Sequence, residues 1–115
     1  MPRAVMIVMS SPIEDSRDEE FNNWYTKTHV PDVLKVPGFV AATRYRLSDT
    51  QIGGAAPEGT HKYLAIYELD TDDLAAANAA LIAAATGGQM EISETLDMSS
   101  SKTLLYEQMT DRMTN

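Results

Sequence analysis

The chain has 115 residues and a formal net charge of −8, with 43% hydrophobic and 23% charged residues and no cysteine. This length and composition predict a single globular domain over residues 1–115, and the lack of cysteine excludes a disulfide scaffold, a thiolate nucleophile and a thiolate metal site. The acidic charge disfavours nucleic acid and anionic membranes as partners, and because the sequence has no signal peptide and no membrane-spanning run, we expect a cytoplasmic protein.

The expected elements begin with a strand over residues 3–9, which is apolar on both alternating faces and therefore typical of a central strand. A helix follows, in which Ser16 and Glu19 match a capping box. Five residues at helical spacing form one stripe of this helix: Phe21, Trp24, Tyr25, Thr28 and His29. Pro31 then ends the helix or starts a separate short turn through Leu34.

Two strands are expected next, over 39–47 and 62–69, joined by a long polar loop over 48–61 that favours a mobile lid or a disordered tip. In the first of these strands, Phe39, Thr43 and Tyr45 alternate with Arg44 and Arg46. A second helix, capped by Thr71 or Asp70, is expected to run to about Ala85 and to stop at Gly87-Gly88. The segment 89–101 is ambiguous, and the last strand is expected over 102–109.

This order of elements, βαββαβ, predicts an α+β fold of the ferredoxin-like type, with a four-stranded antiparallel sheet and both helices on one face. All four strands carry apolar residues on both sides, yet the chain has no third helix or second sheet to cover the other face. A second copy of the chain is the simplest cover, so we expect a homodimer.

Several stretches of the sequence resemble one known family as a set. They are Glu20-Phe21-Asn22-Asn23-Trp24-Tyr25, Thr28-His29-Val30-Pro31-Asp32, Val36-Pro37-Gly38-Phe39, Arg44-Tyr45-Arg46-Leu47 and the run from Lys62 to Leu69. On these residues the chain resembles the EthD-like proteins of the dimeric α/β barrel superfamily. The resemblance implies a ferredoxin-like sandwich that pairs into a dimeric α/β barrel and encloses a pocket. Polyketide cyclases and dehydratases, muconolactone isomerases, monooxygenases and haem-degrading enzymes share that superfamily, so the resemblance implies the fold more firmly than the reaction.

His29 is the leading candidate for chemistry. At the end of the first helix its charged form would be favoured by the helix dipole, and an imidazole suits proton transfer near neutral pH. The alternative is a structural histidine that bonds a carbonyl group or packs on Trp24. Asp32 is either a carboxylate that orients His29 or a solvated turn residue, and His61 is expected on the surface.

Tyr45, Tyr67 and Thr43 form an expected polar-aromatic group, with the two tyrosines on adjacent strands and on faces that could be the same one. A phenol there can donate a hydrogen bond to a carbonyl or enolate oxygen, although tyrosines are also typical of dimer interfaces. The expected substrate-binding residues are Trp24, Tyr25, Thr43 and Phe39; for Trp24 the alternative is core packing. Arg44 and Arg46 are expected to reach the rim or to pair with acids such as Glu68, with carboxylate binding as the alternative.

The leading hypothesis is a cofactor-independent enzyme of the lyase, dehydratase, cyclase or isomerase type that acts on a small aromatic or polyketide-like molecule. His29 would be the general acid or base, and Tyr45 or Tyr67 would stabilise oxyanion charge. One alternative is a non-catalytic protein that binds a small hydrophobic metabolite, and another is a haem-binding or monooxygenase-type protein. Two isolated histidines without cysteine predict no metal site, and no cofactor is expected.

Overall fold

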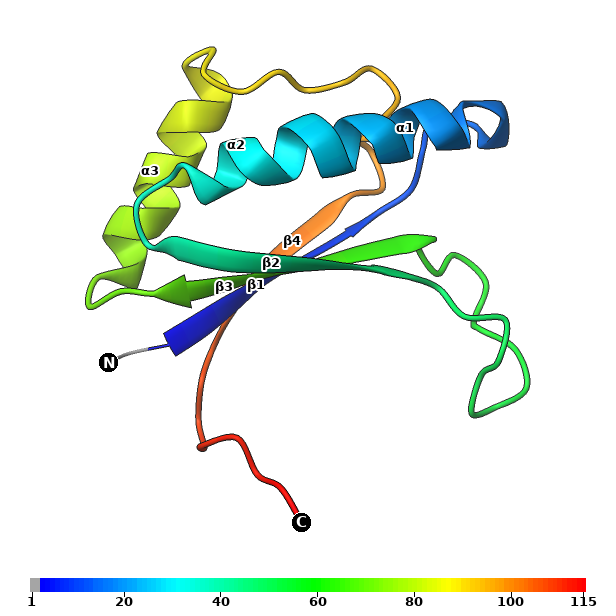
Figure 1. Cartoon of the computed structure of the whole chain (residues 1–115). Helices are drawn as coiled ribbons and strands as arrows, with labels where there is room; N and C mark the ends of the chain where they lie inside the picture. The colour runs from blue at the N-terminus through cyan, green and yellow to red at the C-terminus, as the bar shows by residue number, and fades with distance from the viewer. Residues whose placement is uncertain (1–2) are drawn as a thin grey trace.

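The computed structural model describes residues 3–115 and has the element order βαββαβ (Figure 1). The four strands are β1 (Arg3–Ser10), β2 (Phe39–Arg46), β3 (Tyr63–Asp70) and β4 (Lys102–Glu107). They form one antiparallel sheet in the order β2-β3-β1-β4, and both helical segments cover the same face of it. The expected ferredoxin-like α+β fold is therefore confirmed.

Of the two alternatives for Pro31, the structure favours a short helical element through Leu34, which here continues directly from the preceding helix. A 3-10 turn, η1 (Asp15–Arg17), leads into α1 (Asp18–Trp24), which continues through a π-helical turn, η2 (Tyr25–His29), into α2 (Val30–Leu34). In the π turn the amide of Val30 donates to the carbonyl of Tyr25, five residues back. The wider turn relieves the clash that a proline ring makes with the preceding turn of a regular α-helix.

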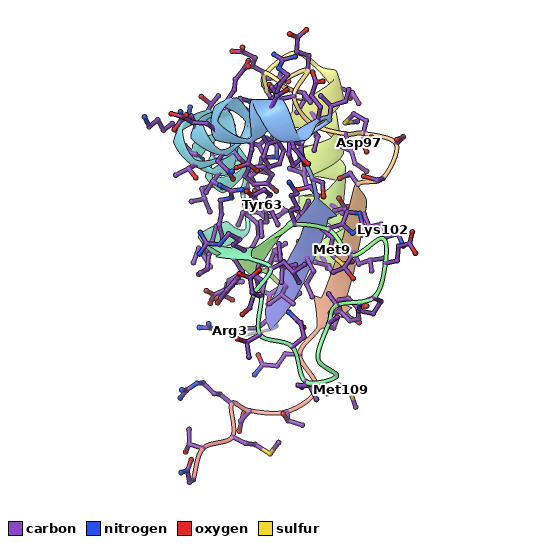
Figure 2. All side chains as sticks on the ribbon, turned by 90° about the vertical axis from the view of Figure 1, so that its right-hand side faces the viewer. Arg3, Met9, Tyr63, Asp97, Lys102 and Met109 are labelled. Carbon is purple, nitrogen blue, oxygen red and sulfur yellow. The ribbon has the colours of Figure 1, made fainter. Side chains whose placement is uncertain are left out.

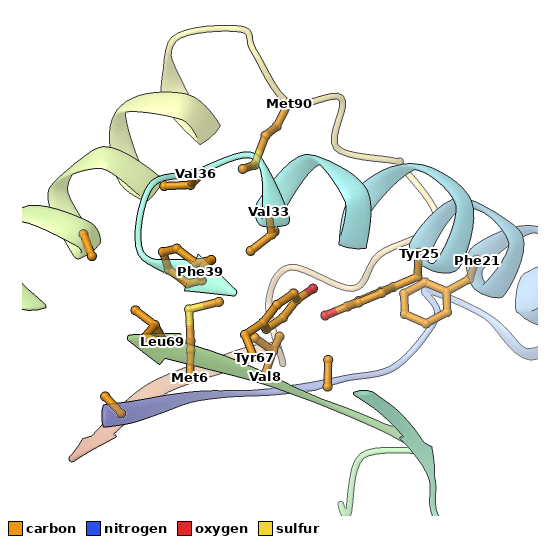
Figure 3. Packing of buried hydrophobic residues seen from close by; sticks show 13 residues of the cluster. Met6, Val8, Phe21, Tyr25, Val33, Val36, Phe39, Tyr67, Leu69 and Met90 are labelled. Atoms are coloured by element: carbon orange, nitrogen blue, oxygen red, sulfur yellow. The ribbon is translucent and has the colours of Figure 1, made fainter. Parts of the chain in front are cut away.

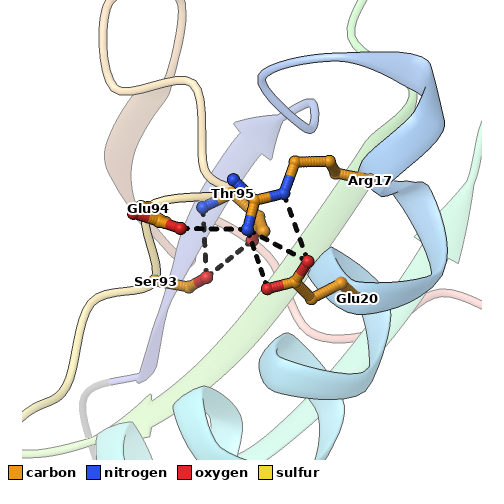
Figure 4. A network of polar contacts seen from close by, with 5 residues as sticks. All are labelled: Arg17, Glu20, Ser93, Glu94 and Thr95. Atoms are coloured by element: carbon orange, nitrogen blue, oxygen red, sulfur yellow. Dashed lines mark hydrogen bonds and ion pairs between the residues drawn. The ribbon is translucent and has the colours of Figure 1, made fainter.

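The expected capping box is also wrong. The residue before α1 is Arg17, which makes no side-chain capping bond, and Ser16 lies inside the 3-10 turn. The guanidinium of Arg17 instead bonds the carboxylates of Glu20, at 2.9 Å, and Glu94, at 3.0 Å (Figure 4). This network ties the start of α1 to the segment 87–101, which contains no helix or strand and is further held by a bond from the amide of Ile13 to the carbonyl of buried Thr95.

The second helix, α3 (Leu74–Thr86), begins two or three residues later than expected and stops before Gly87-Gly88 as expected. Its N-cap is Asp73, whose Oδ1 accepts a hydrogen bond from the amide of Ala76 at 2.9 Å. Thr71 and Asp70 therefore do not cap the helix; the Thr71 hydroxyl accepts a bond from the amide of Asp73 instead.

Asp73→Ala is expected to lower the free energy of unfolding by about 1 kcal/mol, because the Ala76 amide loses its acceptor. Asp72→Ala removes the same charge one residue earlier and is the matched control, with an expected loss of less than about half that value. Urea denaturation followed by circular dichroism measures both. Equal losses in the two variants would show that charge near the helix start, rather than the cap, is what matters.

A β-bulge between Phe39 and Ala41 shifts the alternation of β2. After the bulge, Ala42 lies opposite buried Tyr67 on the helix-facing side, whereas Tyr45 lies opposite Leu64 on the other side. The expectation that Phe39 shares a face with Thr43 and Tyr45 was wrong for this reason, because an extra residue in one strand reverses which side chains face the core.

The core lies between the sheet and the helical layer (Figure 3). The other sheet face carries no helix: Figure 1 shows on that side only the loop between β2 and β3 and the C-terminal tail. Ile66, Ile7 and Leu104 form an apolar row across three neighbouring strands of this open face. Within residues 3–115, none of the helices has the length and apolar character needed to cross a membrane.

Candidate functional site

Tyr25 is the centre of a polar-aromatic cluster between η2 and the sheet. It is 2% exposed, its ring lies edge-on to His29 with centroids 4.9 Å apart, and the guanidinium carbon of Arg44 lies 4.3 Å from its ring centroid. Figure 3 shows the hydroxyls of Tyr25 and Tyr67 pointing toward one another. The cluster, defined as Tyr25, His29, Arg44 and Tyr67, therefore draws on one helical turn and two adjacent strands.

Each member of this cluster holds a buried polar atom that makes no hydrogen bond of standard length and angle within the described chain, although the Tyr25 and Tyr67 hydroxyls lie close enough for each to affect the pKa of the other. The atoms are the Tyr25 and Tyr67 hydroxyl oxygens, His29 Nδ1 and Arg44 Nε. Leaving a buried donor or acceptor unpaired costs about 1–3 kcal/mol, so such atoms are few in native proteins. Here four such atoms, one of them on Tyr25 itself, lie close together in the core.

Burial makes the cluster a set of neutral groups beside one permanent cation. It lowers the pKa of His29 to about 4; the Asp32 carboxylate opposes this shift and the Arg44 cation adds to it. Burial also raises the pKa of Tyr67 and of Tyr25. Near neutral pH the imidazole is therefore uncharged and both phenols keep their protons. The expected stabilisation of charged His29 by a helix end was wrong, because the helix continues past His29 into α2.

Arg44 is the member that the sequence reasoning underweighted. Its Nη1 donates to Thr26 Oγ1 at 2.8 Å and its Nη2 to Asn22 Oδ1 at 2.9 Å, so helix α1 and turn η2 hold it over the Tyr25 ring. The expected acidic partner, Glu68, lies on the open face of the sheet, opposite Val5 and Ala41. The signal that could have pointed to Arg44 is its alternation with Thr43 and Tyr45 in β2, once the bulge is taken into account.

A surface hollow of 450 Å³ lies beside Arg44 at the β2 edge of the sheet. Its lining residues are Asp18, Asn22, Arg44, Tyr45, Arg46 and Tyr63. Tyr63, to which the sequence reasoning gave little weight, donates its hydroxyl proton to Asp18 at 2.5 Å. Arg44 thus separates the solvent in this hollow from the buried ring of Tyr25.

The structure brings together only some of the expected site residues. Trp24 stacks on His29 at 4.8 Å, and its indole N–H donates to the carbonyl of Glu91. Phe39 packs edge-on against Tyr67 at 6.5 Å. Thr43 and Tyr45 lie on the opposite sheet face from Tyr67, so the expected pairing of Tyr45 with Tyr67 was wrong.

The remaining candidates have structural partners. Asp32 forms an ion pair with Lys35 at 3.4 Å, and His61 is partly buried, with its Nε2 donating to the carbonyl of Ser100 at 2.6 Å. No group of three or more histidine, cysteine, aspartate or glutamate side chains in the described residues is arranged to hold a metal ion.

The buried Nδ1 of His29 is not placed to hold a haem iron. An axial histidine needs one ring nitrogen free to meet a porphyrin plane. Here the imidazole is stacked on Trp24 and edge-on to Tyr25, with Nδ1 buried among them. The neighbouring rings occupy the space that a porphyrin would need at that atom.

Solved structures with this fold come from several organisms. A dimeric ferredoxin-like protein from an uncultured marine organism is 15% identical, with 99% of this chain and 100% of that chain covered and a TM-score of 0.57. The haem degrader MhuD from Mycobacterium tuberculosis is 17% identical, with 96% and 99% covered and a TM-score of 0.57. A protein of the ethyl tert-butyl ether D (EthD) family from Bacillus halodurans is 17% identical, with 95% and 100% covered and a TM-score of 0.50. At these identities the likeness establishes the fold alone.

No curated protein matches the sequence. One family model does match, over residues 5–107, and it describes a domain of unknown function, DUF4286. The match spans nearly the whole sheet and both helical segments. The chain therefore belongs to the DUF4286 family.

Proposed function

We propose that this protein is a cofactor-independent acid–base enzyme that acts on a small aromatic or polyketide-like carbonyl compound, in a step of the lyase, dehydratase, cyclase or isomerase type. The four unpartnered buried polar atoms of the Tyr25 cluster carry this proposal. A core selected only for packing would pair these atoms or replace them with apolar groups. The oxygen of a carbonyl compound bound among them would accept hydrogen bonds from the two phenols.

Each group of the cluster suits one role in enolisation. The uncharged imidazole of His29 can accept a proton from the carbon next to the carbonyl group. The phenols of Tyr25 and Tyr67 can donate hydrogen bonds to the oxygen on which negative charge develops, and the Arg44 cation beside Tyr25 favours that charge. Burial strengthens these interactions, because little water competes for the same groups.

In our proposal, substrate reaches the cluster from the hollow beside Arg44. The guanidinium lies between this hollow and the Tyr25 ring, and only two side-chain hydrogen bonds, to Thr26 and Asn22, hold it there. In our proposal the side chain swings into the hollow to admit substrate and then returns to close the site.

Exchange of substrate protons for deuterium tests this chemistry directly. With acetophenone in heavy water, we expect the purified protein to remove the methyl proton NMR signal faster than buffer does, and His29→Phe to slow that exchange by about 100-fold. Phenylalanine preserves an aromatic ring against Trp24 but lacks the base. A rate equal to that of buffer, or a rate unchanged in His29→Phe, would favour the non-catalytic binding protein instead.

We also propose that two copies pair through their open sheet faces, as in an EthD-like dimeric α/β barrel. The apolar row of Ile66, Ile7 and Leu104 supports this pairing, because a soluble protein seldom leaves such a face in water. A structural neighbour is itself described as dimeric.

Light scattering is expected to give twice the chain mass of 12.6 kDa at micromolar concentration. Ile7→Lys, which places a charge in the middle of the apolar row, is expected to weaken the dimer by at least about 100-fold. Lys27→Met, on the helical layer, is the control and should leave the mass unchanged. A monomeric wild-type protein would refute the pairing.

A further inference from the structure

We propose a second ligand site at the loop end of the sheet, outside the Tyr25 cluster, for a small carboxylate with an apolar body. It is a hollow of 520 Å³ between the open sheet face and the end of the loop that joins β2 to β3. This volume is in the range of pockets that bind small organic molecules. The hollow shares no residue of the Tyr25 cluster, so the proposal does not depend on the enzyme activity proposed above.

The first argument is charge. The hollow is lined by three cationic side chains, Arg46, Lys62 and Lys102, and by a single carboxylate, Glu58. The chain as a whole carries a net charge of −8. A local excess of positive charge on so acidic a protein favours an anion at this place.

The second argument is that two of these cations have no ion-pair partner within residues 3–115. Lys62 is paired with Asp15 at 2.5 Å, but Arg46 and Lys102 take part in none of the ion pairs found among those residues. Both are exposed strand residues. Their charges are therefore available to a bound carboxylate.

The third argument is the apolar floor. Met9 lies opposite both Leu64 on β3 and Lys102 on β4, so the sheet register places a cation directly beside apolar side chains. Figure 2 shows Met9 and Lys102 close together near the loop. Tyr45, which is half exposed, also lines the hollow. An apolar body with one anionic group matches this surface better than a fully hydrophilic phosphate does.

The fourth argument is that hydrogen bonds fix the wall of the hollow. The amide of Leu47 donates to the carbonyl of Lys62 at 2.8 Å, and the amide of Lys62 donates to Ser11 Oγ at 3.1 Å. His61 is tied to the carbonyl of Ser100. The base of the loop is therefore anchored to the segments before β4 and after β1, and little ordering cost remains for ligand binding.

Binding of 2-naphthoate to the purified protein, measured by isothermal titration calorimetry, tests the site. We expect it to bind about tenfold more tightly than the neutral isostere 2-naphthalenemethanol, because only the carboxylate meets the cations. Lys102→Met is expected to weaken naphthoate binding about three- to tenfold and to leave the neutral probe unchanged. Lys27→Met removes the same charge from the helical layer and should change neither affinity.

Amide chemical shifts locate the bound probe. Changes at Met9, Thr60 and Leu64 are expected, whereas changes confined to Val33 and Tyr67 would place naphthoate in the Tyr25 cluster and overturn the proposal. Equal affinity for the two probes would also overturn it. A Lys102→Met variant that binds naphthoate normally but no longer dimerises would also overturn the proposal. The cations would then form ion pairs with acidic groups of a second copy and would not bind a ligand.

Discussion

Tyr67→Phe is expected to leave the protein as stable as the wild type, or up to about 1 kcal/mol more stable, while weakening the binding of an oxyanion about tenfold or more. Tyr67 is fully buried, and its hydroxyl, which faces that of Tyr25, makes no hydrogen bond of standard length and angle in the described chain. Removing that hydroxyl relieves a desolvation penalty and keeps the ring that packs against Phe39. In an ordinary core the same change would break a hydrogen bond and cost stability.

4-Nitrophenol is a suitable probe, because its phenolate form is coloured and its neutral form is not. Hydrogen-bond donors and a nearby cation favour the phenolate, so wild-type protein should increase the colour at a pH where the free probe is partly neutral. Tyr25→Phe should act like Tyr67→Phe. Tyr106→Phe, at a half-exposed position on the open face, is the matched control and should bind the probe normally.

Two outcomes would contradict this account of the cluster. A loss of more than about 1 kcal/mol in Tyr67→Phe would mean that the hydroxyl has a partner in solution, such as an ordered water molecule, whose bond the wild type keeps. Unchanged nitrophenolate binding in both tyrosine variants would mean that the phenols do not stabilise an oxyanion. Either result would remove the basis for placing the reaction at this cluster.

The sequence predicted the fold well because strand and helix periodicity are local signals. The central strand β1 is apolar on both faces, the helix stripe from Phe21 to Tyr25 is clear, and Gly87-Gly88 marks the end of α3. Asp73 was missed as the cap because several acidic and hydroxyl residues stand together there. Only the backbone path decides which one meets a free amide.

The candidate site was predicted less completely, because two local irregularities decide it. The bulge at Phe39/Ala41 puts Arg44 under the helices and moves Tyr45 to the opposite face. The π turn carries the helix through Pro31 and encloses His29, which a regular helix ending there would have left at a terminus. Each depends on a single extra residue, which hydrophobic periodicity does not reveal.

His29 should give the protein a distinct dependence of stability on pH. In the folded protein burial lowers its pKa from 6.5 to about 4. Between these two values the unfolded chain binds a proton that the folded chain does not, so the free energy of unfolding rises with pH. The His29 contribution is fully present above about pH 6.5 and is lost as the pH falls to about 4. The difference amounts to about 3 kcal/mol.

His29→Phe isolates this contribution, because phenylalanine can stack on Trp24 but cannot bind a proton. Urea denaturation at intervals from pH 7 to pH 4 should show a steep fall in the wild type and a shallower one in His29→Phe, which lacks the proton binding of His29 but keeps the other titratable groups. The two curves should differ most at the acid end, where the variant becomes the more stable protein. Parallel curves would mean that a group other than His29 binds more protons in the unfolded chain than in the folded chain. His29 would then reach solvent and charge freely, and it could not act as the buried neutral base that the proposed reaction requires.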